Sequence, residues 1–262
     1  MVTLQQAVEL GSVLVLALFF SFSERARPWE ALAVSLGAFL GEEACIRWYS
    51  AYQYSPGWTV FVDRLPLAVL FIWPAVVLSA RAVLRALLGR APALLVGLLV
   101  VFDAALVEPV ATHAGLWSWN LPGFFSVPPI GPLGWGCYAA AASFLLDKLS
   151  GPRALAAALG APVLAHAGIL ALWWGGLRWL QADISALSAA LASLLICIAA
   201  AAAVLASRKR LPWREAIPRG AAAGLFAGLL WAAPDRALLL YAAPFALPWL
   251  LLLRLRPGPA PR

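Results

Sequence analysis

Side chains that bind metals or carry redox chemistry are scarce in this sequence. Its 262 residues include two histidines and three cysteines, and neither HExxH nor CxxC spacing occurs. These absences exclude a histidine-rich di-iron desaturase and argue against a zinc site and a disulfide framework. The sequence also lacks a P-loop, a GxSxG elbow and a DDxxD-like cluster for magnesium–diphosphate binding. We therefore expect an activity that needs no metal and no cofactor.

Charged residues are also scarce. They make up 12% of the chain, whereas 63% is hydrophobic and the mean hydropathy is +0.87. Soluble domains are about half apolar and about a quarter charged, so this chain has too few charges to cover its apolar surface in water. The net charge of +7 comes from basic residues in short segments between apolar runs. Such residues orient membrane proteins, and we do not expect nucleic-acid binding.

Apolar stretches follow one another along the whole chain, and about 20 such residues cross a bilayer as a helix. This pattern predicts an all-α, polytopic integral membrane bundle of eight to nine transmembrane helices. The nine stretches are residues 4–22, 31–48, 65–80, 93–111, 131–146, 154–174, 184–206, 220–231 and 237–253. The eighth is short, and only Pro234, Asp235 and Arg236 separate it from the ninth. These two could instead form one kinked or re-entrant element.

Basic residues predict the orientation of the bundle. With nine spans and the N-terminus outside, only Arg47, Arg64, Arg178 and Arg236 of the 19 Lys and Arg residues lie on the outer side. The rest lie inside, as the positive-inside rule expects, and the C-terminus is cytoplasmic. No cleavable signal is evident, so the first helix is expected to remain as an anchor in the bacterial inner (cytoplasmic) membrane.

One domain is expected. Residues 1–256 form the transmembrane bundle, and the Pro-rich residues 257–262 form a disordered tail. The basic residues of 208–219 predict a cytoplasmic loop, which acts as a topology signal or touches anionic lipid headgroups. The sequence does not indicate an oligomeric state.

Ionisable residues within the apolar stretches are the candidates for function, because charge is costly in hydrocarbon. The candidates that we take from them are Glu42, Glu43, Arg47, Asp103, Glu108 and His166. Each has a structural alternative. Glu43 and Arg47, four residues apart, could form an ion pair. Glu108 precedes Pro109 and could end a helix, and His166 could be a hydrogen-bonded core residue. Asp103 needs a partner on another helix or a proton of its own.

Three of these residues share one predicted depth. Glu42, Asp103 and His166 lie roughly 15–18 Å from the inner ends of their helices at 1.5 Å per residue. We therefore expect a shared polar cavity. The uncharged segment 112–132, with Trp117 and Trp119, is expected to fold back at the membrane surface as a lid or lateral gate, or as an interfacial aromatic anchor.

Carboxyl groups in an aromatic pocket suit one class of chemistry. A buried carboxyl group can hold its proton at neutral pH and deliver it as a general acid. Trp and Tyr faces can stabilise a developing cation. Protonation of a carbon–carbon double bond in a lipid would need these parts.

The segment from Gly41 to Trp135 resembles a known family, the membrane carotenoid-biosynthesis proteins that include the bacterial and archaeal carotenoid 1,2-hydratases. The resembling motifs are an early acidic residue, Tyr-x-Tyr, an Asp, an acidic-Pro pair, Gly-x-Trp-x-Trp, Val-Pro and Gly-Trp. Here they are Glu42 or Glu43, Tyr52-Gln53-Tyr54, Asp103, Glu108-Pro109, Gly115-Leu116-Trp117-Ser118-Trp119, Val127-Pro128 and Gly134-Trp135. Two positions depart from the pattern: the family has Asp-Pro at Glu108-Pro109, and an Asn before Gly134-Trp135.

The resemblance implies hydration of the terminal double bond of an acyclic carotenoid end, without a redox cofactor. Asp103 is the expected proton donor, and Glu42, Glu43 or Glu108 would position water or relay protons. The expected substrate-binding residues are Tyr52, Tyr54, Trp117, Trp119, Trp135, His166 and Arg47. A membrane terpenoid cyclase, a small proton- or cation-coupled transporter and an assembly protein remain as alternatives. Product mass separates hydration from cyclisation, and flux in proteoliposomes would indicate transport.

Overall fold

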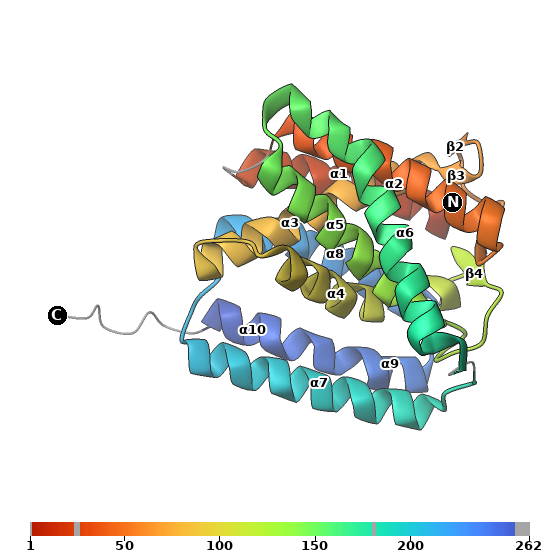
Figure 1. The fold of residues 1–262 in the computed structure, drawn as a ribbon. Helices are drawn as coiled ribbons and strands as arrows, with labels where there is room; N and C mark the ends of the chain where they lie inside the picture. The colour runs from red at the N-terminus through yellow and green to blue at the C-terminus, as the bar shows by residue number, and fades with distance from the viewer. Residues whose placement is uncertain (1, 24–26, 180–181, 255–262) are drawn as a thin grey trace.

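The structure is a computed structural model that describes residues 2–23, 27–179 and 182–254 (Figure 1). The chain is 77% helical, which confirms the all-α class. The α-helices are α1 (Leu4–Phe22), α2 (Pro28–Tyr49), α3 (Leu67–Leu88), α4 (Ala93–His113), α5 (Ile130–Lys148), α6 (Ala157–Gly175), α7 (Ala186–Ser207), α8 (Trp213–Ala232), α9 (Arg236–Ala242) and α10 (Ala246–Arg254). The 3-10 helices are η1 (Gly151–Ala156), η2 (Leu177–Trp179) and η3 (Ala243–Phe245), and the strands are β1 (Tyr52–Tyr54), β2 (Phe61–Val62), β3 (Leu65–Pro66) and β4 (Trp117–Trp119).

Six helical segments are long and apolar enough to cross a membrane. They are Leu4–Phe22, Leu67–Leu88, Ala93–His113, Gly151–Gly175, Ala186–Ser207 and Arg236–Leu253. The expectation of an integral membrane protein agrees with this finding. Helices α2, α5 and α8 are of similar length, with 22, 19 and 20 residues, but α2 and α8 carry several charged residues. A total of eight or nine spans therefore stays a prediction, as does the orientation of the termini.

Helix α3 extends beyond the predicted end at residue 80, because a charged residue there is accommodated inside the bundle. Arg81 is 1% exposed. Its Nη1 donates to the carbonyl and the hydroxyl of Ser143 on α5, both at 2.7 Å. Its Nη2 forms an ion pair with Asp147 at 2.8 Å. A charged residue with such partners does not need to leave the helix bundle.

The eighth and ninth stretches are separate helices. Helix α8 ends at Ala232, and α9 begins at Arg236 after an N-cap in which the Asp235 carboxylate accepts the Leu238 N–H at 2.7 Å. Such a cap satisfies an N–H group that has no partner within the helix. The predicted loop over 208–219 is wrong in its second half, because α8 already begins at Trp213. The predicted tail 257–262 lies outside the described residues.

Pro109 lies inside α4 and does not end it. Because proline has no N–H, the carbonyl of Ala105 loses its helical partner. The hydroxyl of Tyr241 on α9 donates to this carbonyl at 2.5 Å. Helix α4 therefore continues to His113, and Glu108 lies within the helix.

Helix α2 is attached to two neighbours by hydroxyl groups. Pro74 frees the carbonyl of Leu70 on α3 in the same way, and the Ser35 hydroxyl donates to it at 2.7 Å. From α5, the Tyr138 hydroxyl donates to the carbonyl of Val34 at 2.6 Å. These bonds satisfy backbone groups for which lipid offers no partner, and they set the positions of α2, α3 and α5 relative to one another.

The helices form a main bundle and a smaller group beside it. Helix α4 packs against α5, α5 against α6, α6 against α2, and α2 against α3. Helix α1 packs against α3 and α8, while α7 lies with α9 and α10 at the lower side of Figure 1. A Cβ at Gly97 would lie 2.8 Å from the carbonyl oxygen of Gly136. Glycine at these positions lets α4 and α5 approach closely, as small residues do in membrane bundles.

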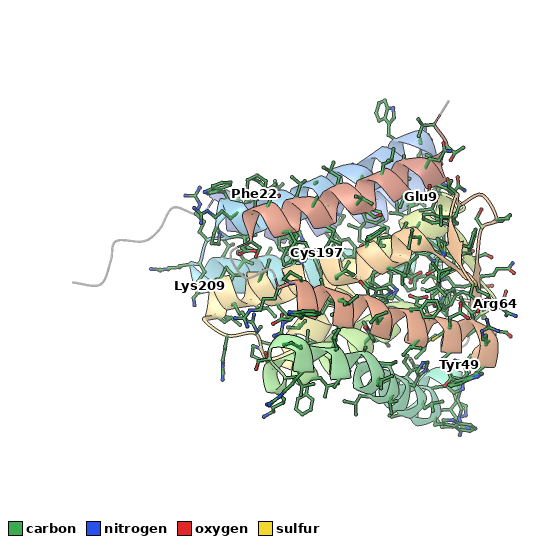
Figure 2. The ribbon with its side chains drawn as sticks, turned by 90° about the horizontal axis from the view of Figure 1, so that it is seen from above. Glu9, Phe22, Tyr49, Arg64, Cys197 and Lys209 are labelled. Carbon is green, nitrogen blue, oxygen red and sulfur yellow. The ribbon has the colours of Figure 1, made fainter. Side chains whose placement is uncertain are left out.

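The strands lie in connecting segments at one end of the bundle. Figure 2 shows Glu9, Tyr49 and Arg64 toward this end and Phe22 and Lys209 toward the other. Strand β1 pairs antiparallel with β4, in the register Tyr52–Trp119 and Tyr54–Trp117. The segment after α4 thus folds back onto the segment after α2, and β2 and β3 form a separate hairpin.

Candidate functional site

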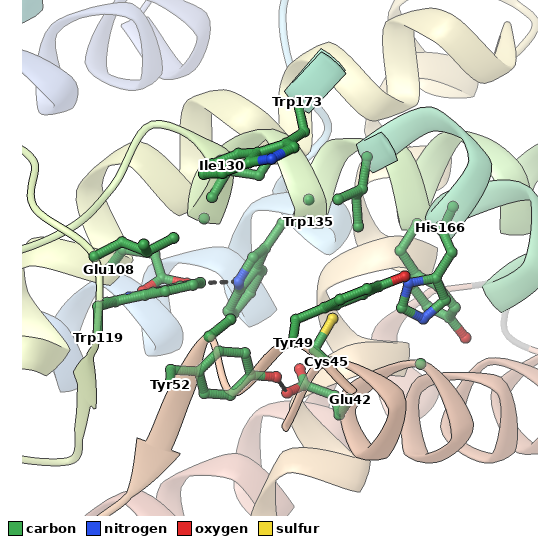
Figure 3. A pocket seen from close by; sticks show the side chains of 18 of the residues that line it. Glu42, Cys45, Tyr49, Tyr52, Glu108, Trp119, Ile130, Trp135, His166 and Trp173 are labelled. Carbon is green, nitrogen blue, oxygen red and sulfur yellow. Dashed lines mark hydrogen bonds between the residues drawn. The ribbon is translucent and has the colours of Figure 1, made fainter. Parts of the chain in front are cut away.

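A cavity of about 450 Å³ lies among α2, α3, α4, α5 and α6 and is bounded by β1 and β4 (Figure 3). We call it the aromatic pocket, because ten of its 24 lining residues are Trp or Tyr. Among the described residues, Glu42 and Glu108 are its two acidic residues, and no Lys or Arg lines it. Small-molecule sites commonly have volumes of about 300–1,000 Å³. The cavity is therefore large enough for a ligand.

Glu108 receives three hydrogen bonds, all from indole groups. Its Oε2 accepts from Nε1 of Trp117 and of Trp119, both at 2.8 Å, and its Oε1 accepts from Nε1 of Trp135 at 2.7 Å. Glu108 is 2% exposed. An indole N–H donates but cannot accept a hydrogen bond, so these partners suit a carboxylate, which only accepts.

Glu42 also receives three hydrogen bonds, but two come from hydroxyl groups. Its Oε2 accepts from the hydroxyls of Tyr52 and Tyr54, the latter at 3.1 Å, and its Oε1 accepts from Nε1 of Trp73 at 2.9 Å. Burial raises the pKa of each hydroxyl, that of Tyr52 and that of Tyr54, well above the ordinary value for tyrosine. Both therefore remain protonated donors at neutral pH. A hydroxyl can also accept a hydrogen bond, so this shell can pass a proton.

The donors to the two carboxyl groups pack against one another as three ring pairs. The ring centroids of Tyr52 and Trp119 are 4.8 Å apart, and those of Tyr54 and Trp117 are 6.0 Å apart. The Trp73 and Trp135 rings are 4.7 Å apart. Aromatic pairs at such separations stabilise one another. Each ring pair thus joins a donor of Glu42 to a donor of Glu108.

The local sequence explains how these donors reach the acids. Side chains at alternate positions of a strand point to the same side, so Tyr52 and Tyr54 face together, as do Trp117 and Trp119. The β1–β4 pairing places the tyrosines opposite the tryptophans. Glu42 and Glu108 lie 14 and 15 residues from the starts of α2 and α4. This distance along each helix is about 21–23 Å.

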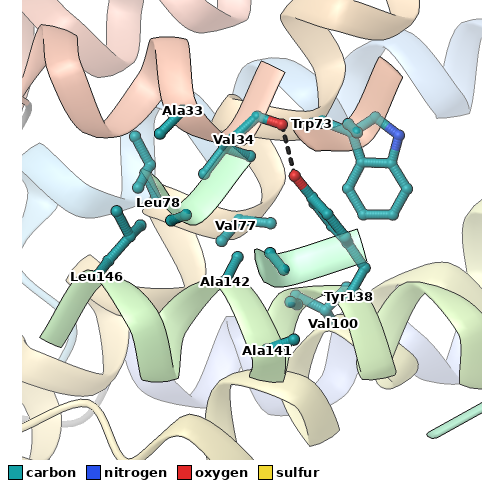
Figure 4. Packing of buried hydrophobic residues seen from close by; sticks show 14 of the residues in the cluster. Ala33, Val34, Trp73, Val77, Leu78, Val100, Tyr138, Ala141, Ala142 and Leu146 are labelled. Atoms are coloured by element: carbon teal, nitrogen blue, oxygen red, sulfur yellow. Dashed lines mark hydrogen bonds between the residues drawn. The ribbon is translucent and has the colours of Figure 1, made fainter. Parts of the chain in front are cut away.

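One wall of the pocket continues into the apolar core. Trp73 packs against Tyr138, with the ring centroids 4.8 Å apart. Figure 4 shows Tyr138 bonded to Val34 beside the buried side chains Val77 and Ala142. Because these residues are close-packed, the donor Trp73 is held by the core and has little room to move.

Eight of the eleven candidate site residues line the pocket. They are Glu42, Tyr52, Tyr54, Glu108, Trp117, Trp119, Trp135 and His166. The His166 ring lies 5.6 Å from that of Tyr49 and 6.3 Å from that of Trp48. Of the three residues expected to share a polar cavity, Glu42 and His166 line this pocket and Asp103 does not. The pocket is mainly aromatic and apolar, and its second acid is Glu108.

Glu43 and Arg47 lie outside the pocket and pair with each other. The Arg47 Nε lies 2.6 Å from Glu43 Oε2, and Arg47 also pairs with Asp63. The backbone N–H of Arg64 donates to Glu43 Oε1 at 3.0 Å. This is the ion pair considered as the structural alternative, and it holds the β2–β3 hairpin against the end of α2.

Asp103 also lies outside the pocket, on another side of α4. Its partner is Arg219 of α8, with 2.8 Å between Arg219 Nη1 and Asp103 Oδ2. The Arg219 guanidinium also lies 4.7 Å from the ring centroid of Trp249. The structure therefore supplies the partner that Asp103 needed on another helix.

Several lining residues were missed by the sequence. Tyr49, Trp73, Tyr138, Trp173 and Trp174 line the pocket but were not among the candidate residues. Trp73 carried a usable signal, because it lies in the interior of α3, whereas belt tryptophans collect at helix ends. Its distance of 31 positions from Glu42 in the sequence hides the contact.

Metal ligands are not grouped in the described part of the chain: no cluster of three or more His, Cys, Asp or Glu residues could hold an ion there. No protein-family model, curated protein or solved structure matches the chain. The interpretation of the aromatic pocket therefore rests on its own residues and geometry.

Proposed function

We propose that this chain is an integral membrane enzyme that protonates a carbon–carbon double bond of an isoprenoid lipid held in the aromatic pocket. One observation carries the proposal. Glu42 and Glu108 are buried in the same apolar cavity, and their hydrogen-bond partners are neutral aromatic donors. Asp103 was the acid expected from the sequence, but its arginine partner and its place outside the cavity favour Glu42 and Glu108.

The two hydrogen-bond shells assign different roles to the acids. Glu42 contacts tyrosine hydroxyls that can relay a proton, so it acts as the proton donor. Among the described residues, Glu108 contacts only N–H donors, so we assign it as a carboxylate that acts as the base. Its negative charge also stabilises positive charge that develops nearby in a water-poor site.

The proposed reaction is hydration. The Glu42 O–H bond breaks as its proton adds to the less substituted alkene carbon, and the alkene π-electrons form the new C–H bond. The adjacent carbon becomes a tertiary cation beside the Trp and Tyr faces. Water forms a C–O bond to this cation and loses a proton to Glu108. The product is a tertiary alcohol, and transfer of the proton from Glu108 through water and the tyrosines to Glu42 restores both acids.

The resemblance of residues 41–135 to the carotenoid 1,2-hydratases supports an acyclic carotenoid end as the substrate. Tyr52, Tyr54, Trp117, Trp119 and Trp135, which carry that resemblance, all line the pocket. Nine spans with the N-terminus outside would place the pocket in the outer half of a bacterial inner membrane. A substrate end would then enter from the lipid.

The experiment is expression in a bacterium that makes lycopene and γ-carotene, followed by chromatography and mass spectrometry of the pigments. We expect a product heavier by one water, which disappears with Glu42→Gln and with Glu108→Gln. Glu9→Gln is the matched control. Glu9 lies outside the pocket, and its Oε1 accepts the Thr59 N–H at 2.6 Å, which a glutamine oxygen can also do.

Three outcomes would change the proposal. A product of unchanged mass would indicate cyclisation, which can begin with the same protonation. Hydration that survives in both pocket variants would remove the two acids from the mechanism. Unchanged pigments in a strain with normal amounts of folded protein would reject carotenoids as the substrate.

A further inference from the structure

The charge of the aromatic pocket differs from that around three other acids of the bundle. Glu43 pairs with Arg47, Asp103 with Arg219, and Asp147 with Arg81 and Arg85. In the part of the chain that the structure describes, the pocket instead has two carboxyl groups and no Lys or Arg in its lining. A buried carboxylate without a counter-charge is costly, so a pocket of this kind favours an incoming positive charge.

The oxygens of both acids leave matching positions open. A carboxylate has about four lone-pair sites. In each acid, Oε2 accepts two hydrogen bonds from side chains of the described residues and Oε1 accepts one. One acceptor position of each Oε1 thus remains for a proton or a ligand.

The pocket walls suit an organic cation better than a hydrated metal ion. Trp and Tyr rings attract cations over their faces, and aromatic cages commonly bind alkylated ammonium groups. The remaining lining is mainly apolar, including Ile130, Ile169 and Leu170. Such a wall suits a hydrocarbon tail, whereas metal ions prefer several oxygen or nitrogen ligands.

The pocket also has an exposed edge between α2 and α6. Three lining residues at this edge are substantially exposed: Tyr49 at 41%, Leu170 at 40% and Trp174 at 60%. Figure 3 shows Tyr49 and His166 on this side of the pocket. An amphiphile in the membrane could therefore bring a charged head to the acids while its tail remains at the apolar edge.

We infer that the aromatic pocket is a binding site for lipophilic ammonium cations, with the charged head at Glu42 and Glu108 and the tail toward the edge between α2 and α6. This inference goes beyond the proposed reaction, because it concerns a stable ligand class and requires no turnover. It shares only the pocket with the proposed function. Ammonium binding and alkene hydration can therefore succeed or fail independently.

The test compares two ligands that differ in one atom. Geranyltrimethylammonium carries a permanent positive charge, and its uncharged isostere has carbon in place of nitrogen. Binding to the full chain in a neutral detergent is followed by tryptophan fluorescence, with empty micelles as the reference. We expect saturable binding of the cation that is at least tenfold tighter than binding of the isostere. Equal affinities for the two ligands would overturn the inference without any variant.

Variants then identify which acid of the pocket cation binding depends on. We expect Glu108→Gln, which removes the carboxylate charge, to weaken cation binding at least tenfold and to leave binding of the isostere within about twofold, which also shows that the pocket remains folded. Glu42→Gln replaces a protonated acid by a neutral amide, so we expect it to weaken cation binding less than Glu108→Gln does. Glu9→Gln should bind both ligands as the original chain does. Cation binding that is undiminished in a folded double variant, Glu42→Gln with Glu108→Gln, would place the cation elsewhere and overturn the inference.

Discussion

Glu42 and Glu43 are neighbours in the sequence, but they lie in opposite kinds of surroundings. Glu42 faces the aromatic pocket and is held by neutral donors, whereas Glu43 pairs with the half-exposed Arg47. Successive residues of a helix point about 100° apart. The same contrast exists on α4 between Glu108, which receives indole N–H groups, and Asp103, which pairs with Arg219. Which helix face carries an acid therefore decides whether it takes part in a site or in packing.

The largest expected effect comes from removing the acid of Glu42. We expect Glu42→Gln to reduce pigment conversion at least about 100-fold, the typical minimum for the loss of a general acid. The measurement is initial product formation per folded enzyme in membranes. A rate within about threefold of the original chain would break the distinction between the pocket acids and the arginine-paired acids.

Asp103→Asn tests the other half of the contrast. This change leaves the Arg219 guanidinium without its counter-charge in a mostly buried position, so we expect a loss of about 3 kcal/mol in unfolding free energy. Reversible unfolding in detergent would measure it. The double variant with Arg219→Gln should recover much of that loss, because it removes both charges. Strictly additive losses in the double-mutant cycle would show that the pair is not coupled.

Trp135→Phe tests how much a neutral N–H donor contributes to the stability of the pocket. The ring remains against Trp73, but Glu108 Oε1 loses its donor at 2.7 Å. We expect a loss of about 2 kcal/mol in stability, as for hydrogen bonds to charged groups. The variant is best measured alone and with Glu108→Gln, whose amide N–H₂ would face the indole N–H. Removing the indole N–H should therefore make Glu108→Gln more stable. If Trp135→Phe does not do so, the pairing of N–H donors with carboxylate oxygens does not determine stability at this site.

The smallest expected effect is that of Glu43→Gln. Its ion-pair partner Arg47 is 43% exposed, so solvent weakens the attraction and we expect a loss below about 1 kcal/mol. Thermal unfolding in the same detergent compares this variant with Glu42→Gln. Because both variants carry the same change at adjacent positions, a difference in stability reports the surroundings of the two residues. A loss as large as that of Asp103→Asn would contradict the expectation that the exposure of Arg47 weakens this pair.

The sequence predicts much of the secondary structure and a large part of the site. The first stretch, 4–22, coincides with α1, and the remaining stretches fall on α2 to α10 with shifted ends. The helices extend past the predicted ends where a polar group finds a hydrogen-bond or ion-pair partner on another helix. Arg81 keeps α3 helical past residue 80 through Ser143 and Asp147, and Tyr241 takes the carbonyl that Pro109 leaves free.

The sequence by itself determined the helical membrane class, because long apolar runs can satisfy their backbone groups in lipid only within the segment. It also placed Glu42 and Glu108 among four candidate acids and named the Tyr-x-Tyr and Trp-x-Trp residues, although it assigned the proton donor to Asp103. Only the tertiary structure decided that these residues surround one cavity, that Trp73 completes the shell of Glu42, and that Asp103 belongs to Arg219. The physical reason is separation along the sequence. A hydropathy pattern describes residues within one helical turn or one span, whereas Asp103 and its partner are 116 positions apart.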